Sequence, residues 1–144
     1  MRFLLPIAAA LAVAGAAHAQ NDVPSEWTSV LVAGDWALAA QNADTVVFAK
    51  DPAPRISPQG YHRVQVRFEF ATPHLGDGQK TYSSLLVLTE YDCAQNKTRN
   101  IQATAFAGHN LTSPLGDPVQ ELSDWSDVEE STIASILQKD ACGD

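Results

Sequence analysis

Two cysteines, Cys93 and Cys142, stand 49 positions apart in a chain of 144 residues and constrain its fold more than any other feature. The chain opens like an export signal: a basic residue at Arg2, an apolar run over residues 3–16, and a small-x-small cleavage motif at 17–19. Exported proteins meet an oxidising compartment, where two thiols are more often bonded than free. We therefore expect Cys93 and Cys142 to form a structural disulfide.

The other interpretations of the two cysteines are a reactive thiol and a metal site. A reactive thiol needs a lowered pKa, and no obvious base lies near either cysteine in the sequence. A zinc site needs four ligands, and the chain has neither a C-x-x-C nor an H-x-x-x-H spacing. We therefore predict no metal and no cofactor. A disulfide that closes a loop of this length stabilises a domain by roughly 4 kcal/mol.

The chain divides into a signal peptide, residues 1–19, and a single domain, residues 20–144. No later apolar run approaches ~20 residues, so we do not expect the protein to span a membrane. The signal holds no cysteine and Gln20 follows its cleavage motif, so we expect no lipid-modified N-terminus. These features predict a periplasmic or secreted protein.

The charge of the chain excludes one class of partner. The formal net charge is −8, and removal of the signal takes Arg2 with it and leaves the domain still more acidic. A field of that sign repels phosphate backbones, so we expect no nucleic-acid partner. The sequence indicates neither which protein or envelope component is the partner nor the oligomeric state.

Period-two patterns predict an antiparallel sheet of about six strands. The clearest strand covers residues 62–70, where one side is apolar and the other polar. The apolar side, expected in the core, consists of Val64, Val66, Phe68 and Phe70. The polar side, expected in water, consists of Arg63, Gln65, Arg67 and Glu69. Further strands are predicted at 45–49, 82–91 and 98–107, with shorter apolar stretches at 27–32 and 36–40 and loops at 51–60, 73–80 and 109–120.

The end of the chain changes to a helical period. Ile133, Ile136 and Leu137 share one face of a predicted helix that stops at Gly143. Its candidate N-caps are Ser126, Asp127 and Ser131. Such a short helix is unstable alone, so we expect it to pack on the sheet. The predicted fold class is α+β, an antiparallel sheet with a C-terminal α-helix tied to it by the disulfide.

Several residues follow one another in a distinctive order in the second half of the chain. They are Tyr82-Ser83-Ser84, an apolar strand that ends at Tyr91-Asp92-Cys93, then Arg99, Trp125, Val128, Ser131 and a short helix that ends at Cys142. This order, over roughly residues 82–142, resembles the surface-adhesin protein E-like family, and the strands between Trp36 and Phe70 fit the family more loosely. The resemblance implies a small α+β domain in which a disulfide joins an antiparallel sheet to a C-terminal helix.

The resemblance also implies a function. The family is known for an outer-membrane lipoprotein that adheres to host matrix and plasma proteins. This sequence departs from that pattern at its N-terminus, because its signal lacks a lipid-attachment cysteine. No residue here matches a ligand site of the family, so we assign no ligand-binding residue.

The sequence offers no catalytic motif. Three histidines follow the signal, at His62, His74 and His109, and we expect each to be solvated. No G-x-S-x-G elbow is present. A hydrolase would need at least two of these histidines and a carboxylate to converge in one pocket. We therefore predict no catalytic residue and no enzymatic activity.

Two charged groups have alternative interpretations. One group is acidic and consists of Asp124, Asp127, Glu129 and Glu130. These carboxylates could bind calcium, but no D-x-[DN]-x-[DN]-G loop is present. Two of them are also explained by their position near the N-terminus of the predicted helix, where negative charge is stabilising. The other group is basic and consists of Arg63, Arg67 and Arg99. These side chains could form a stripe that binds an anionic ligand, or they could form ion pairs with Glu69 and Glu90. We favour the ion pairs.

The three tryptophans, Trp27, Trp36 and Trp125, are expected to pack in the core or against the helix rather than to form a ligand platform.

Taken together, the features favour an exported, non-catalytic, adhesin-like binding module of the bacterial cell envelope. The alternatives are a periplasmic structural, inhibitor or accessory protein without a ligand, and, less favoured, a small secreted hydrolase.

Overall fold

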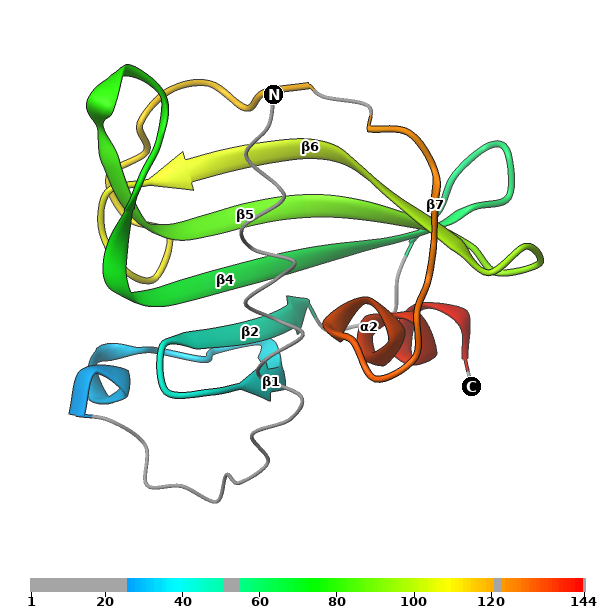
Figure 1. Ribbon diagram of the computed structural model, residues 1–144, viewed down its shortest axis with the longest axis horizontal. Helices are drawn as coiled ribbons and strands as arrows, with labels where there is room; N and C mark the ends of the chain where they lie inside the picture. The colour runs from blue at the N-terminus through cyan, green and yellow to red at the C-terminus, as the bar shows by residue number, and fades with distance from the viewer. Residues whose placement is uncertain (1–25, 51–54, 121–122, 144) are drawn as a thin grey trace.

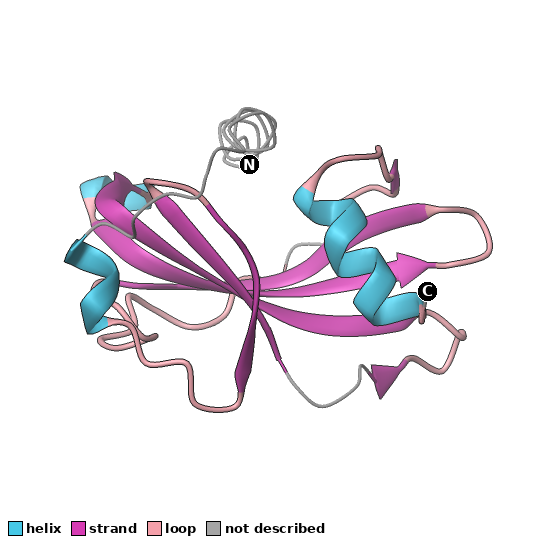
Figure 2. Cartoon of the chain, turned by 90° about the horizontal axis from the view of Figure 1, so that it is seen from below, coloured by secondary structure: helices cyan, strands magenta, loops and turns pink. Residues whose placement is uncertain are grey.

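The computed structural model describes residues 26–50, 55–120 and 123–143, so the predicted signal peptide lies outside the described residues. The elements are η2 (Glu26–Val30), β1 (Trp36–Gln41), β2 (Thr45–Lys50), β3 (Arg55–Ile56), β4 (His62–Leu75), η3 (Asp77–Gln79), β5 (Thr81–Asp92), β6 (Lys97–Phe106), β7 (Ser126–Asp127) and α2 (Ile133–Cys142). Figure 1 shows the long strands side by side, and Figure 2 shows α2 on one side of the twisted sheet.

The described strands form one seven-stranded antiparallel sheet. Six of them lie in the order β1-β2-β4-β5-β6-β7, and the two-residue β3 pairs with the start of β4. The prediction of an antiparallel sheet of about six strands with a C-terminal helix is therefore confirmed. β5 is a central strand, as predicted, because β4 and β6 pair with it along most of its length.

The core lies between α2 and the side of the sheet that faces it. The helix contributes Ile133, Leu137 and Ala141, which are spaced four residues apart and so form one stripe. They belong to a cluster of buried residues with Val47, Ala49, Val64, Val66, Tyr91 and Val128. The prediction that Ile136 belongs to this face was wrong: its exposed fraction is 40%, because it lies beside the stripe rather than on it.

Both ends of α2 are capped. The N-cap is Thr132, whose hydroxyl accepts a hydrogen bond from the N–H of Ser135, while the hydroxyl of Ser135 accepts one from the N–H of Thr132. None of the predicted caps takes this place; Ser126 and Asp127, for example, form β7 and pair with β6. Gly143 ends the helix as predicted, with a left-handed φ of 80° and its N–H donating to Lys139.

Three connections fix α2 to the sheet. Cys93, just after β5, is bonded to Cys142 at the end of the helix, as predicted. The hydroxyl of Tyr91 donates to the carbonyl of Ala134 at 2.9 Å. The ring of His62, at the start of β4, lies 2.8 Å from the carbonyl of Ala141. The short helix is therefore fixed at its first turn and at its last.

The polar side of β4 is largely buried, contrary to the sequence prediction. Gln65 is exposed, but the exposed fraction of Arg67 is 2% and that of Glu69 is 0%. Alternation assigns the two residues correctly to the side of the sheet away from α2. This side is nevertheless not open to water there, because the segments that contain Val32 and Asn110 contact Arg67 and Glu69. β4 also continues to Leu75, past the predicted end at residue 70, after a register shift between Glu69 and His74.

Removal of the disulfide should lower the stability of the domain. The cross-link closes a loop of 49 positions, and loss of that constraint on the unfolded chain costs about 4 kcal/mol. For a domain of this size we expect Cys142→Ser to lower Tm by roughly 10–15 °C in scanning calorimetry. The reduced wild-type protein should melt like the variant; equal Tm values for oxidised wild type and variant would contradict the prediction.

Candidate binding surface

A buried carboxylate organises the side of the sheet away from α2. Glu69 accepts hydrogen bonds from Nε of Arg67 at 2.6 Å and from the backbone N–H of Asn110 at 2.9 Å. Its other oxygen lies 3.1 Å from Nδ1 of His109. Since Glu69 and Arg67 are both buried, each compensates the charge of the other.

Arg67 and Asn110 extend this network to the N-terminal segment. Arg67 donates to the carbonyl of Val32 at 2.9 Å and to Oδ1 of Asn110 at 2.8 Å. The side-chain amide of Asn110 donates to the carbonyl of Val30, and its Oδ1 accepts from the N–H of Val32. The network therefore joins β4 to the segment before β1 and to the turn after β6.

That turn has an unusual backbone. Asn110, Leu111 and Ser113 have left-handed φ values of 62°, 58° and 60°. Residues other than glycine adopt such backbone angles infrequently. The hydroxyl of Ser84 holds the turn by donating to the carbonyl of Gly108 and accepting from the N–H of Leu111. The contacts with β4 and β5 thus maintain this conformation.

A second buried carboxylate, Glu90, lies on the same side of the sheet. It accepts from Nε of Arg63 at 2.7 Å and from Nε of Arg99 at 2.9 Å. Burial acts to raise the pKa of Glu90, but the hydrogen bonds and charges of the two guanidinium groups outweigh it and lower the pKa below its usual value. Arg99 also lies over the ring of Trp125, 4.3 Å from its centre.

The ion-paired interpretation of the arginines is therefore confirmed. Arg63 and Arg99 pair with Glu90 across strands, whereas Arg67 and Glu69 are two positions apart on β4. All three guanidinium groups already face carboxylates. This side of the sheet consequently presents no row of unpaired arginines for an anionic ligand.

The three histidines have separate environments. The prediction that each is solvated was wrong, because each is partly buried against other side chains or backbone groups. His62 contacts the end of α2, and His109 contacts Glu69 and stacks on Trp27 with ring centres 5.7 Å apart. His74 lies on β4 against Phe70, with ring centres 3.9 Å apart. Within residues 26–50, 55–120 and 123–143, no three or more histidine, cysteine, aspartate or glutamate side chains are grouped to hold a metal ion.

The tryptophans contact polar and cationic groups rather than the buried core. The indole N–H of Trp27 donates to the carbonyl of Ala43. The amine of Lys50 lies over the ring of Trp36, 4.8 Å from its centre, and Trp125 packs edge-on against Tyr61 with ring centres 4.8 Å apart. All three rings are half-buried. The prediction that they pack in the core or against α2 was wrong, because none of them belongs to the buried cluster between α2 and the sheet.

Two hollows flank the N-terminal half of α2. The larger, with a cavity volume of about 330 Å³, lies over the centre of the sheet between α2 and the segment that contains Ser123 and Asp124. Its floor is apolar and includes Val66, Phe68 and Val87, while its rim carries hydroxyl and amide groups such as that of Asn100. This combination of an apolar floor and a polar rim is typical of binding pockets.

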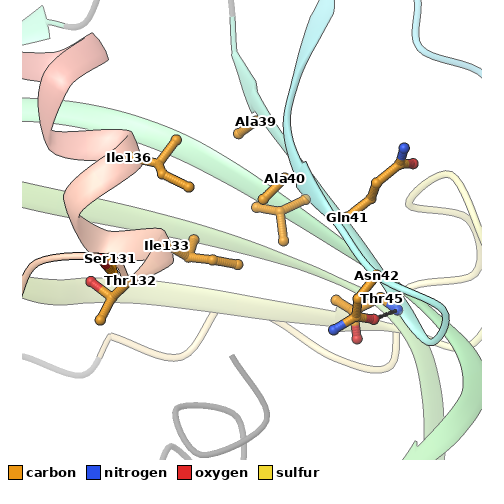
Figure 3. Close-up of a pocket in the computed structure, with 10 residues that line it drawn as sticks. Ala39, Ala40, Gln41, Asn42, Thr45, Ser131, Thr132, Ile133 and Ile136 are labelled. Carbon is orange, nitrogen blue, oxygen red and sulfur yellow. Dashed lines mark hydrogen bonds between the residues drawn. The ribbon is translucent and has the colours of Figure 1, made fainter. Parts of the chain in front are cut away.

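The smaller hollow, of about 240 Å³, lies between α2 and the β1–β2 hairpin. Ile133 and Ile136 point from the helix toward Ala39 and Ala40 of β1 (Figure 3). Among the residues that the structure describes, no charged side chain lines this hollow; Gln41, Asn42, Thr45, Val47, Ser131 and Thr132 complete its lining. We call it the hairpin trough.

A β-bulge shapes the trough. The register of β1 with β2 shifts between Leu38 and Ala40, so Ala39 is an extra residue. Ala39 and Ala40 both pack against the core cluster. Sequence analysis missed this site, because two consecutive alanines in an apolar stretch do not reveal a bulge and Ile136 was assigned to the core.

The sequence model of the Surface-adhesin protein E family matches residues 36–143, from the first residue of β1 to the cap of α2. The chain belongs to this family. The resemblance seen in the second half of the sequence is thereby confirmed and extends over β1 and β2. No curated protein sequence matches the chain.

A solved structure supports the same fold. The structure of Haemophilus influenzae protein E matches this one with a TM-score of 0.61 at 9% sequence identity, over 85% of this chain and 91% of that chain. At this identity the likeness shows the fold alone. Among the described residues, no helix is long and apolar enough to cross a membrane.

The Glu69 network should contribute strongly to stability. Glu69→Gln leaves the buried Arg67 without a compensating charge, which costs about 3–5 kcal/mol in unfolding free energy. The matched control is Asp127→Asn, which breaks the exposed pair with Lys97 and should cost at most about 1 kcal/mol. Urea denaturation measures both; a Glu69→Gln cost as small as that of the control would contradict the prediction.

The stability of the protein should decrease as His74 becomes protonated. Burial lowers the pKa of His74 below its usual 6.5, so the folded state binds the proton more weakly than the unfolded state. The contribution of neutral His74 to the free energy of unfolding is therefore complete above about pH 6.5 and is lost as the pH falls below that value.

We expect His74→Phe, which keeps the ring contact with Phe70, to reduce the loss of unfolding free energy between about pH 7 and about pH 5. Urea titrations at each pH measure this loss, and an NMR titration of His74 should give a midpoint below 6.5. A midpoint at or above that value would refute the assignment.

Proposed function

We propose that the protein is an exported, non-catalytic, adhesin-like binding module of the bacterial cell envelope whose partner is another protein. The observation that carries this proposal is the family match, which spans the whole sheet and the C-terminal helix. The family is described as a surface adhesin. A binding role needs a rigid surface with unoccupied contact area, and the side of the sheet that carries α2 has both.

The geometry of that side supports binding rather than catalysis. The two hollows beside α2 are open, mostly apolar, and fixed by the disulfide and the two hydrogen bonds to the helix. General acid–base catalysis requires groups within hydrogen-bond reach of one substrate. In the part of the chain that the structure describes, the histidines contact different elements, and each arginine of the predicted basic group already contacts a carboxylate.

The proposed location follows from the sequence. Residues 1–19 have the pattern of a signal peptide, so the mature chain begins at Gln20 and reaches the periplasm or the medium. A disulfide-bonded domain suits either compartment. The proposed partner class is a matrix or plasma protein of a host, or a protein of the envelope itself.

The test combines location with binding. Cells should be fractionated into periplasm, outer membrane and medium, and the mature N-terminus sequenced. The purified oxidised domain, residues 20–144, is then titrated over immobilised matrix proteins, plasma proteins and purified envelope proteins. We expect an N-terminus at Gln20 and saturable binding to at least one protein. The Cys93→Ser, Cys142→Ser double variant should bind more weakly, because α2 is no longer held.

Two results would contradict the proposal. Absence of saturable binding across both protein sets would refute the binding role. Retention of residues 1–19 in a cytoplasmic fraction would refute export.

A further inference from the structure

The two edges of the sheet differ in how they are covered. Along the outer side of β6, β7 pairs at Lys97 and Thr98, and single bridges join Ala103 to Val119 and Phe106 to Pro114. At the opposite edge, β1 is the terminal strand, and its strand pairing among the described residues is with β2 on one side. Figure 1 shows β1 at this margin of the sheet. β1 therefore presents backbone donors and acceptors to one further strand.

β1 lacks the features that usually protect an edge strand. Protected edges carry lysine, inward-pointing charges or proline, or are very short. The six residues of β1, Trp-Ala-Leu-Ala-Ala-Gln, include none of these. The exposed fraction of Leu38 is 56%, and Ala37 is also exposed. The bulge at Ala39 is the one protective device in the strand.

The hairpin trough lies directly beside this edge. Ile136 projects from α2 toward Ala39 and Ala40 and remains 40% exposed (Figure 3). Side chains alternate between the two faces of a strand, so every second residue of a strand added to β1 would face α2. Those residues would meet Ile136 and the trough. Backbone pairing and a side-chain pocket thus occur together, which is the combination that strand-addition sites use.

The surroundings of the trough are acidic. Asp44, in the turn between β1 and β2, and Glu129 and Glu130, just before the cap of α2, are exposed. No basic side chain in the described part of the chain lines the trough, and the full sequence has a net charge of −8. A basic residue at the end of an incoming segment that lies beside the β1–β2 turn would therefore be attracted, and an acidic one repelled.

We propose that β1 binds an extended segment of a partner protein as an added strand, with apolar side chains at alternate positions facing α2 and lysine or arginine at the end beside the β1–β2 turn. This inference rests on the proposed binding function and assigns that function to one edge. A second copy of this chain fits less well. Two copies are both strongly acidic and repel one another as whole molecules.

The test uses linear peptides, selected from a random displayed library on the oxidised mature domain and then synthesised. We expect the selected peptides to share alternating apolar residues with one basic end. Their Kd, measured by fluorescence anisotropy, should rise about tenfold or more for Leu38→Lys, because a lysine on the edge opposes strand addition. Methylation of alternate backbone nitrogens in the peptide should abolish binding, because it removes the donors that β1 would meet.

Leu75→Lys is the matched control. Leu75 is also an exposed leucine on a strand, with an exposed fraction of 64%, but it lies at the end of β4, outside the trough and outside β1. This variant should bind the peptides as wild type does. Ile136→Gln should weaken binding while preserving the fold, because Ile136 is outside the buried stripe of α2; circular dichroism checks the fold of all three variants.

Each alternative result would overturn the inference. Equal Kd values for wild type and Leu38→Lys would do so, as would equal affinity for peptides whose basic end is replaced by glutamate. A wild-type dimer in sedimentation experiments that Leu38→Lys dissociates would assign the edge to a second copy. If Leu38→Lys retains full binding to the protein identified in the titration above, the edge is not the site although the proposed function stands. If wild type binds no protein there, the proposed function itself fails.

Discussion

The position of α2 depends on one covalent bond. A helix of ten residues is too short to persist in water by itself, and a single stripe of three side chains joins it to the core. The bond between Cys142 and Cys93 fixes its last residue to the end of β5, and the Tyr91 hydroxyl fixes its first turn. Both hollows have α2 as one wall, so their shapes follow from these connections.

The opposite side of the sheet combines buried charge with apolar packing by residues such as Val46 and Phe48. Glu69 and Glu90 are buried there, and each is compensated by arginine. Through Asn110 and Trp125 these clusters also hold segments that come from outside the long strands. Buried ion pairs add little net stability but are costly to break. The two sides of the sheet therefore differ: one is covered by the segments that contact the buried charges, and the other carries α2 and the two hollows.

Much of this arrangement can be predicted from the sequence. The alternation of side chains along β4 and the helical period from Ile133 onward are local signals in the sequence. The pairing of the two cysteines follows from the oxidising compartment that an exported protein meets. The strand, the helix and the disulfide predicted from these signals are all confirmed. Periodicity also assigns Arg67 and Glu69 to the correct side of β4. It does not show which segments cover that side, because this depends on a turn more than forty positions away along the chain.

The proposed binding surface is harder to predict for the same reason. In the sequence, Ile136 is adjacent to Leu137, which belongs to the buried stripe of α2. Only the position of α2 beside the β1–β2 hairpin shows that Ile136 faces the trough instead. The bulge at Ala39 depends on the register with β2, which no alanine pattern specifies. The cap at Thr132 was missed because two of the candidate caps are used to pair with β6.

The network around Asn110 also affects how the protein can be produced. Asn110-Leu111-Thr112 and Asn96-Lys97-Thr98 are acceptor sequences for N-linked glycans in eukaryotic secretory pathways. In the fold, the amide nitrogen of Asn110 donates to Val30, and that of Asn96 donates to Val128. A sugar on either nitrogen would occupy the space of these carbonyls. Yeast or mammalian secretion would therefore yield a chain whose modification competes with its folding, whereas export in a bacterial host leaves both amides unmodified.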